Sequence, residues 1–161
     1  MQMESIPESA VQRKVLIVDD QHLVLETLGT MLTRAGYRVV CVPTGAGALA
    51  AARLASFDAA LIDIYMPEMD GFETAIRQRE QNGRRGRTTR IWHMTGVSSP
   101  AVERRSAQCG VMGLFLKPFN LAHMCKVLEA GFSAPVPAME AEIPAALPPF
   151  AKDERPTESG G

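Results

Sequence analysis

The chain has 161 residues, 46% of them hydrophobic and 22% charged, and its formal net charge is −1. This length suits one ordinary domain, and the near-zero charge provides no field that would attract nucleic acid or an anionic membrane. The N-terminal sequence lacks the basic start and apolar run of a signal peptide, and no apolar stretch reaches the roughly 18–20 residues that span a bilayer, so we expect a cytoplasmic protein without nucleic-acid or membrane partners.

Short apolar runs alternate with longer amphipathic segments along most of the chain. A short continuous apolar run is typical of a strand that is covered on both faces. The pattern predicts five strands, at residues 15–18, 38–42, 59–62, 90–94 and 113–116, each followed by a helix. The expected helix boundaries are Gly36 at the end of the first helix, Thr44, Asp70, Ser98 or Ser99 and Asn120 as N-terminal caps, and Gly131 at the end of the last helix.

Five strand–helix units in succession predict an α/β fold. Because each pair of strands is joined by a whole helix, the strands should run parallel in one doubly wound sheet, with right-handed crossovers and helices on both faces. We expect this domain to span residues 13–132. Residues 1–12 are expected to form a flexible leader, and the proline-rich residues 133–161 a mostly disordered tail.

Charged and polar residues stand where four of the predicted strands end. Asp19 and Asp20 follow the first strand, Asp63 the third, Thr95 the fourth and Lys117 the fifth. In an open parallel sheet, ligands bind beyond the carboxyl ends of the strands, so these residues should face one crevice. Crowded carboxylates repel one another, and a hard divalent cation such as Mg²⁺ would relieve the repulsion. One carboxylate could then act as a nucleophile on phosphorus.

Four short motifs resemble the receiver (CheY-like) domain of two-component response regulators. They are Val18-Asp19-Asp20, the loop D-I-Y-M-P-E-M-D-G at residues 63–71, Met94-Thr95-Gly96, and Lys117-Pro118-Phe119. Their order and spacing match the family over roughly residues 13–132. The resemblance implies a flavodoxin-like, five-stranded parallel sheet in the order 2-1-3-4-5, flanked by five helices, which is the strand order of CheY itself.

The same resemblance implies a role for each site residue. Asp63 would be the phosphoacceptor, Lys117 would pair with the phosphoryl group, and Thr95 would swing toward it on activation. Lys117–Pro118 would be a cis peptide. The implied Mg²⁺ ligands are Asp20 directly, Asp19 through water, Asp63 and the backbone carbonyl of Tyr65.

Two positions depart from the family pattern. Leu114 stands where the family usually has Tyr or Phe, and Phe115 cannot replace it because neighbouring strand residues face opposite sides of the sheet. Gly96 replaces a frequent alanine after the threonine. We therefore expect phosphorylation with an atypical readout. Tyr65 and Val97 should flank the phosphoryl group, and neither positions water well, which predicts slow self-dephosphorylation.

The resemblance implies a single-domain response regulator rather than an enzyme in the ordinary sense. A histidine kinase or histidine phosphotransfer protein would phosphorylate Asp63, and a downstream target protein would bind the face formed by residues 98–131. The main alternative is a receiver-like interaction module that acts without phosphorylation, which Leu114 favours mildly. An aspartyl-nucleophile phosphatase is disfavoured because Tyr65 stands where its second aspartate would be. Dinucleotide and P-loop motifs are absent from the sequence.

The remaining notable side chains have structural interpretations. The cysteines lack C-x-x-C spacing and are expected to be small buried hydrophobes: Cys41, Cys109 and Cys125. The histidines are expected on the surface or in the core rather than as phosphocarriers: His22, His93 and His123. An arginine cluster is expected in a solvated loop, with an acidic partner as the alternative: Arg84, Arg85, Arg87 and Arg90. Trp92 should be a packing residue.

Overall fold

A computed structural model describes residues 12–140 of the chain. All but one residue of the expected leader, and residues 141–161 of the expected tail, lie outside this range. The elements are β1 (Lys14–Val18), α1 (His22–Arg34), β2 (Arg38–Val42), α2 (Gly45–Leu54), β3 (Ala59–Asp63), α3 (Gly71–Arg84), β4 (Arg90–Thr95), α4 (Pro100–Gln108), β5 (Gly113–Leu116) and α5 (Leu121–Phe132).

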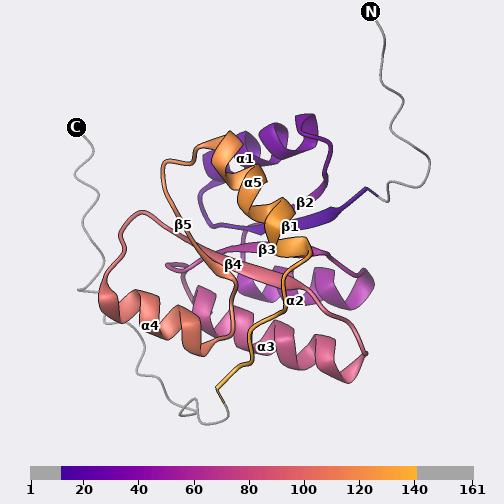
Figure 1. The fold of residues 1–161 in the computed structure, drawn as a ribbon, viewed down its shortest axis with the longest axis vertical. Helices are drawn as coiled ribbons and strands as arrows, with labels where there is room; N and C mark the ends of the chain where they lie inside the picture. The colour runs from indigo at the N-terminus through magenta and orange to yellow at the C-terminus, as the bar shows by residue number, and fades with distance from the viewer. Residues whose placement is uncertain (1–11, 141–161) are drawn as a thin grey trace, which may run out of the picture.

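The five strands form one parallel sheet in the order β2-β1-β3-β4-β5. Helices α1 and α5 cover one face of the sheet, and helices α2, α3 and α4 cover the other (Figure 1). The predicted doubly wound α/β fold and the strand order are therefore confirmed. In the part of the chain that the structure describes, no helix is both long and apolar enough to cross a bilayer.

Alternate residues of each strand divide the core into two layers. In β1, Val15 and Ile17 pack with α1 and α5, whereas Leu16 and Val18 pack with α2, α3 and α4. All four side chains are fully buried. The central strands read as continuous apolar runs because both of their faces are covered by helices.

The predicted helix boundaries are confirmed with one exception. The side chains of four N-terminal caps accept a backbone N–H of the first helical turn: Thr44, Asp70, Ser99 and Asn120. Helix α1 ends at Arg34, and Gly36 follows in the left-handed region at φ 105°. That conformation is easiest for glycine, which explains the residue found there.

The exception is Gly131, which lies inside helix α5 rather than at its end. A Cβ atom at this position would collide with the indole of Trp92, whose Cη2 atom would be 2.7 Å away. The glycine is therefore explained by close packing and not by helix termination. Trp92 is buried as predicted, and its ring stacks on Phe115 with the centroids 6.2 Å apart.

The expectation that all three cysteines are buried was wrong. Cys109 is buried, Cys125 is half-buried and Cys41 is exposed. Cys41 lies on β2, an edge strand whose outer side no further strand covers within the described range. Position in the sheet, which a short apolar run does not reveal, decides its exposure.

Two residues of the arginine cluster make hydrogen bonds to a neighbouring helix, in addition to lying near a solvent-exposed loop. The guanidinium of Arg85 donates to the carbonyl of Arg53 at 2.6 Å, and that of Arg87 donates to the carbonyl of Ala52 at 3.0 Å. Both carbonyls belong to the last turn of helix α2, where backbone acceptors lack helical partners. The cluster therefore caps the C-terminal end of a neighbouring helix.

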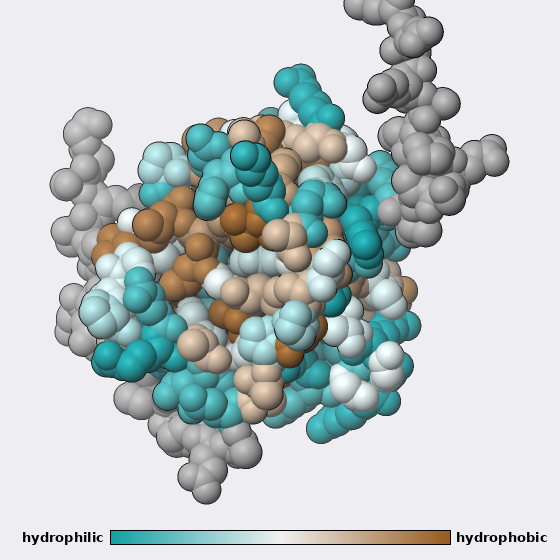
Figure 2. Space-filling model, viewed as in Figure 1, coloured by the Kyte–Doolittle hydropathy of each residue, from teal (hydrophilic) through white to brown (hydrophobic). Residues whose placement is uncertain are grey.

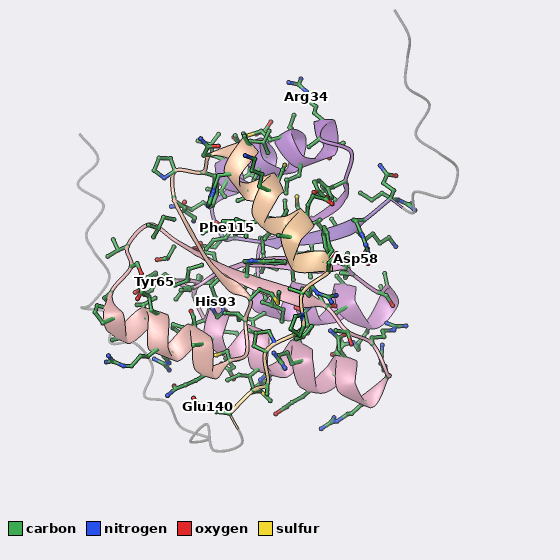
Figure 3. All side chains as sticks on the ribbon, viewed as in Figure 1. Arg34, Asp58, Tyr65, His93, Phe115 and Glu140 are labelled. Carbon is green, nitrogen blue, oxygen red and sulfur yellow. The ribbon has the colours of Figure 1, made fainter. Side chains whose placement is uncertain are left out.

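Residues 133–140 contain no helix or strand after the C-terminal cap of α5. The guanidinium of Arg90 donates to the carbonyl of Ala134 at 2.9 Å, and the amide of Glu140 donates to the carbonyl of Gln108 at 3.2 Å. This segment thus connects the end of α5 to the end of α4, and Glu140 is labelled near its end in Figure 3.

Candidate functional site

Three carboxylates come together at the carboxyl edge of the sheet. Asp19 and Asp20 follow β1, and Asp63 ends β3, which is paired directly with β1 so that Val18 lies beside Ile62. One carboxylate oxygen of each aspartate lies within 4.8 Å of the others. Asp19 and Asp63 are buried, whereas Asp20 is exposed. The structure thus brings together the acidic residues that the sequence predicted to share one crevice.

The carboxylate of Asp19 accepts hydrogen bonds at both of its oxygen atoms. Its Oδ1 atom accepts the amide N–H of Gln21 at 2.9 Å, and its Oδ2 atom accepts from the ammonium of Lys117 at 2.7 Å. Its side chain is fully buried. A buried charge needs such partners, so Asp19 serves to hold Lys117 over the acidic pocket.

Lys117 connects two of the acids. Its ammonium lies 2.7 Å from Asp19 and 3.3 Å from Asp63, and only 19% of its side chain is exposed. Burial lowers the pKa of Lys117, but the hydrogen bonds and negative charges of the two aspartates outweigh burial and raise it overall. The lysine is therefore charged at neutral pH. The Lys117–Pro118 peptide bond is cis, as predicted.

Asp63 lies in an environment that opposes its ionisation. Burial and, to a smaller extent, the charge of Asp19 raise the pKa of its carboxyl group to about 7, although the ammonium of Lys117 counteracts both. A cation bound among the three carboxylates would favour the ionised form. Asp63 therefore has the electrostatic setting of a carboxylate that needs a metal partner.

The loop after Asp63 returns closely over its own backbone. The amide of Gly71 donates to the carbonyl of Ile64 at 2.8 Å. A Cβ atom on Gly71 would collide with the carbonyl oxygen of Asp63 and would approach the Cα atom of Ile64 to 2.7 Å. The glycine at position 71 is therefore explained by this close approach of two backbone segments.

Thr95 ends β4 beside the pocket and is fully buried. Its hydroxyl donates to the carbonyl of Val97 at 2.8 Å and accepts the amide of the same residue at 3.2 Å. The hydroxyl is thus engaged within its own loop. Tyr65, in the loop after Asp63, is half-buried and packs against the core layer between the sheet and helices α2, α3 and α4.

The expected difference between Leu114 and Phe115 is confirmed. Leu114 packs with the layer of α2, α3 and α4, whereas Phe115 packs with α1 and α5 on the other side of the sheet. In Figure 3 the label of Phe115 lies on the α5 side of the sheet, opposite the label of His93. No aromatic ring of β5 therefore faces the same layer as Thr95 among the described residues.

The donor set fits a hard divalent cation. The three aspartates offer carboxylate oxygens only, and neither histidine nor cysteine contributes a ligand atom to this cluster. Mg²⁺ is bound in proteins through one or two carboxylates together with water and phosphate oxygens. The backbone carbonyl of Tyr65, in the loop directly after Asp63, is a further oxygen from this region of the sequence.

The fold and the site define a parallel α/β domain with an acidic, lysine-bearing pocket at the carboxyl edge of its sheet. A family model for the response regulator receiver domain matches residues 15–129. The chain therefore belongs to this family. Receiver domains are signalling modules that bind Mg²⁺ at an acidic pocket and interact with histidine kinases and downstream targets.

Two relatives illustrate the contexts in which similar sequences occur. The sensor histidine kinase AruS of Pseudomonas aeruginosa is 33% identical over 131 residues, which cover 81% of this chain and 13% of the kinase. The transcriptional regulatory protein PdtaR of Mycobacterium tuberculosis is 29% identical over 139 residues, which cover 84% of this chain and 65% of that protein. The chain thus spans less than two thirds of the length of either relative.

Two solved structures share the fold. The chemotaxis protein CheY4 of Vibrio cholerae superimposes with a TM-score of 0.70 at 34% identity, over 74% of this chain and 98% of CheY4. The receiver domain of the sensor histidine kinase PA1611 of Pseudomonas aeruginosa superimposes with a TM-score of 0.68 at 28% identity, over 77% of this chain and 100% of that domain. The PA1611 domain was crystallised with a magnesium ion coordinated in its active-site cleft.

Two residues near the site have contacts that the sequence pattern does not reveal. The pattern predicts only a surface or core position for His93 and does not reveal the close backbone contact of Gly71. His93 is fully buried on β4, and its ring nitrogens contact Gly71 and Ser106. The available sequence signal is its spacing: His93 lies two residues before Thr95 on a strand, so both side chains face the same side of the sheet.

Proposed function

We propose that this chain is a single-domain response regulator that accepts a phosphoryl group on Asp63 from a histidine kinase or a histidine phosphotransfer protein. The observation that supports the proposal is the position of Lys117, whose ammonium contacts both Asp19 and Asp63 inside a pocket of three carboxylates. A cationic group beside a buried carboxylate can neutralise the phosphoryl oxygens as they arrive.

The transfer needs few protein groups. An Oδ atom of Asp63 attacks the phosphorus of a phosphohistidine, a P–O bond forms, and the P–N bond breaks. The electron pair leaves with the imidazole nitrogen of the donor, which then takes up a proton. Mg²⁺ held by Asp19, Asp20, Asp63 and the backbone carbonyl of Tyr65 would neutralise the carboxylates and the phosphoryl oxygens.

Lys117 and Thr95 would then exchange partners. Lys117 is closer to Asp19 than to Asp63, so it can hold the pocket together while leaving one oxygen of Asp63 able to react. In the phosphorylated state its ammonium would turn to a phosphoryl oxygen. The hydroxyl of Thr95 would release the carbonyl of Val97 and donate to another phosphoryl oxygen.

The downstream target would bind the face formed by residues 98–131. Leu116 on this face is 56% exposed, and the adjacent Val97 is 44% exposed. Figure 2 shows brown side chains gathered on the left of the viewed face, where β5 and the loop after β4 lie in Figure 1, while the helices below are mostly teal. Exposed apolar side chains beside the pocket suit a protein surface whose affinity changes on phosphorylation.

The test is incubation with Mg²⁺ and a small phosphodonor such as acetyl phosphate, followed by intact-mass measurement. We expect the mass to rise by one phosphoryl group in the parent protein and not in Asp63→Asn. Asp58→Asn is a matched control, because Asp58 precedes the same strand at the opposite edge of the sheet and accepts the amide of Lys14. Phosphorylation of Asp63→Asn, or none in the parent protein, would overturn the proposal.

The alternative is an interaction module that acts without phosphorylation. Leu114 favours it, because β5 presents no aromatic ring on the face of the sheet that carries Thr95. The same measurement separates the two functions. A parent protein that stays unmodified at every donor concentration, yet still binds Mg²⁺, would favour the interaction module.

A further inference from the structure

One buried imidazole joins strand β4 to two helices. His93 is fully buried on β4, its Nδ1 atom lies 2.8 Å from the hydroxyl of Ser106 on α4, and its Nε2 atom lies 2.9 Å from the carbonyl of Gly71 on α3. Figure 3 places the label of His93 beside β4, on the side of the sheet where α3 and α4 lie. The ring is therefore a polar contact between the centre of the sheet and these helices.

The protonation of the ring follows from its partners. A carbonyl oxygen can only accept, so the Nε2 atom of His93 carries the proton that is donated to Gly71. Burial lowers the pKa of His93 to about 4, so the ring is neutral at pH 7. Its Nδ1 atom then has a lone pair and accepts the hydroxyl proton of Ser106. The two hydrogen bonds thus run in one direction, from Ser106 through His93 to Gly71.

This series of hydrogen bonds ends at Gly71, which contacts the segment that carries Asp63. The amide of Gly71 donates to the carbonyl of Ile64, the residue after Asp63. The space beside the Cα atom of Gly71 is filled by the backbone of Asp63 and Ile64, so no side chain separates them. A displacement of the Asp63 backbone must therefore move Gly71 as well.

At its other end, the series of hydrogen bonds begins at Ser106 on helix α4. Ser106 is 2% exposed and donates to His93. The neighbouring guanidinium of Arg105 lies 4.6 Å above the ring of Phe72, and that ring meets His93 edge-on with the centroids 5.3 Å apart. The thiol of Cys109, one turn later, points to the carbonyl of Phe72 at 3.8 Å. Helix α4 therefore rests on His93 and on the first turn of α3.

We propose that His93 is a positioning residue that couples phosphorylation of Asp63 to the position of helix α4. This inference rests on the proposed function. Phosphorylation moves the backbone after Asp63, Gly71 follows, and the fixed hydrogen bonds of His93 carry the movement to Ser106. Leu114 provides no aromatic ring that could carry it from Thr95, so the link through His93 supplies a route within the described residues.

The test compares amide hydrogen exchange of residues 102–109 with and without Mg²⁺ and beryllium fluoride, a stable substitute for the phosphoryl group. Ser106→Ala removes the hydroxyl that links His93 to α4. We expect the exchange response of α4 in this variant to fall by roughly two- to tenfold, the equilibrium effect of one hydrogen bond. Asn82→Ala is the matched control, because Asn82 is also a buried side chain and donates to Thr89 at 3.1 Å, at the far end of α3.

A spectroscopic measurement distinguishes coupling from packing. If His93 transmits the change, the nitrogen-15 shift of its Nδ1 atom moves when beryllium fluoride is added to the parent protein, whereas a residue that only fills space keeps its shift. An α4 response in Ser106→Ala equal to that of the parent protein, or an Nδ1 shift that stays unchanged, overturns the inference. Loss of the response in Asn82→Ala to the same extent also overturns it, because the effect would then be general destabilisation.

Failure of the proposed function gives a different result. In that case the parent protein takes no phosphoryl group from acetyl phosphate, and both conclusions fall together. If the parent protein and Ser106→Ala are phosphorylated to the same extent and only the α4 response differs, the inference is supported. If neither extent nor response differs, the proposed function stands and the coupling through His93 is rejected.

Discussion

Replacement of Gly71 by alanine tests the closest backbone contact near Asp63. The added Cβ atom would collide with the carbonyl oxygen of Asp63 and would lie 2.7 Å from the Cα atom of Ile64 and 2.9 Å from the carbonyl carbon of Asp63. These are backbone atoms and cannot rotate away. The loop that carries Asp63 must therefore shift by several tenths of an ångström or more to accept the methyl group.

The expected loss of stability follows from two opposing effects. Overpacking costs about 1–3 kcal/mol, and replacing a helical glycine by alanine returns about 0.5–1 kcal/mol. The net change in the free energy of unfolding of Gly71→Ala is a loss of about 1–2 kcal/mol. With a urea dependence of about 1–3 kcal/mol per molar, the midpoint of urea unfolding should fall by roughly 0.5–1 M.

Gly83 provides the matched control within the same helix. A Cβ atom there would meet no atom within 4 Å, so Gly83→Ala should raise the free energy of unfolding by about 0.5–1 kcal/mol. In Gly71→Ala, the shifted loop displaces Asp63. This variant should therefore be phosphorylated by acetyl phosphate roughly ten- to a hundredfold more slowly than the parent protein. A Gly71→Ala protein as stable as Gly83→Ala would refute the close-packing argument.

Three further predictions concern lifetime, pH and helix capping. Tyr65→Asn should lose its phosphoryl group roughly tenfold faster than the parent protein, because asparagine can position water, and a mass time course with Tyr65→Phe as control checks this. His93 has a folded pKa of about 4, so the unfolded chain binds a proton between pH 6.5 and 4 that the folded chain does not, and the contribution of His93 to stability should fall by about 3 kcal/mol as the pH drops through this window. Asp63, whose pKa is raised to about 7, contributes in the opposite direction over much of this window, so the difference between the parent protein and His93→Gln in urea unfolding across the pH range isolates the His93 effect. Arg87→Ala removes the donor to the carbonyl of Ala52 and should cost about 0.5–1.5 kcal/mol in urea unfolding, while Arg84→Ala, at an exposed position, should cost less.

The sequence predicted the strands to within one residue at either end, and the reason is physical. A short apolar run marks the part of a strand whose side chains pack into the core, so the ends of the run give the approximate ends of the strand. The structure adds Lys14, Asp63 and Thr95 to the predicted strands, because backbone pairing continues past the last apolar side chain. The meeting of the aspartates was predictable for the same reason, since all parallel strands end at one edge.

The partners of individual side chains were less predictable. Strand alternation assigns each residue to a face, which correctly separates Leu114 from Phe115, but it does not say which polar group on that face will be within reach. Lys117 lies closer to Asp19 than to Asp63, and Thr95 bonds to its own loop, because the positions of the connecting loops decide these contacts.

His93 shows how far the partners of a side chain can be predicted from the sequence. Its parity with Thr95 on β4 predicts that it faces α3 and α4, and its apolar neighbours predict burial. A buried neutral imidazole has one N–H donor and one acceptor nitrogen, so strand parity and burial together predict a polar partner for each nitrogen on the side of the sheet that α3 and α4 cover. Which atoms fill those roles depends on the packing of Gly71 against the Asp63 backbone, and that contact is made possible by the absence of a single methyl group. Gly71, which permits the close approach, is hydrogen-bonded to His93, which contacts α4. Substitution of Gly71 should therefore weaken the response of α4 as well as the stability of the domain.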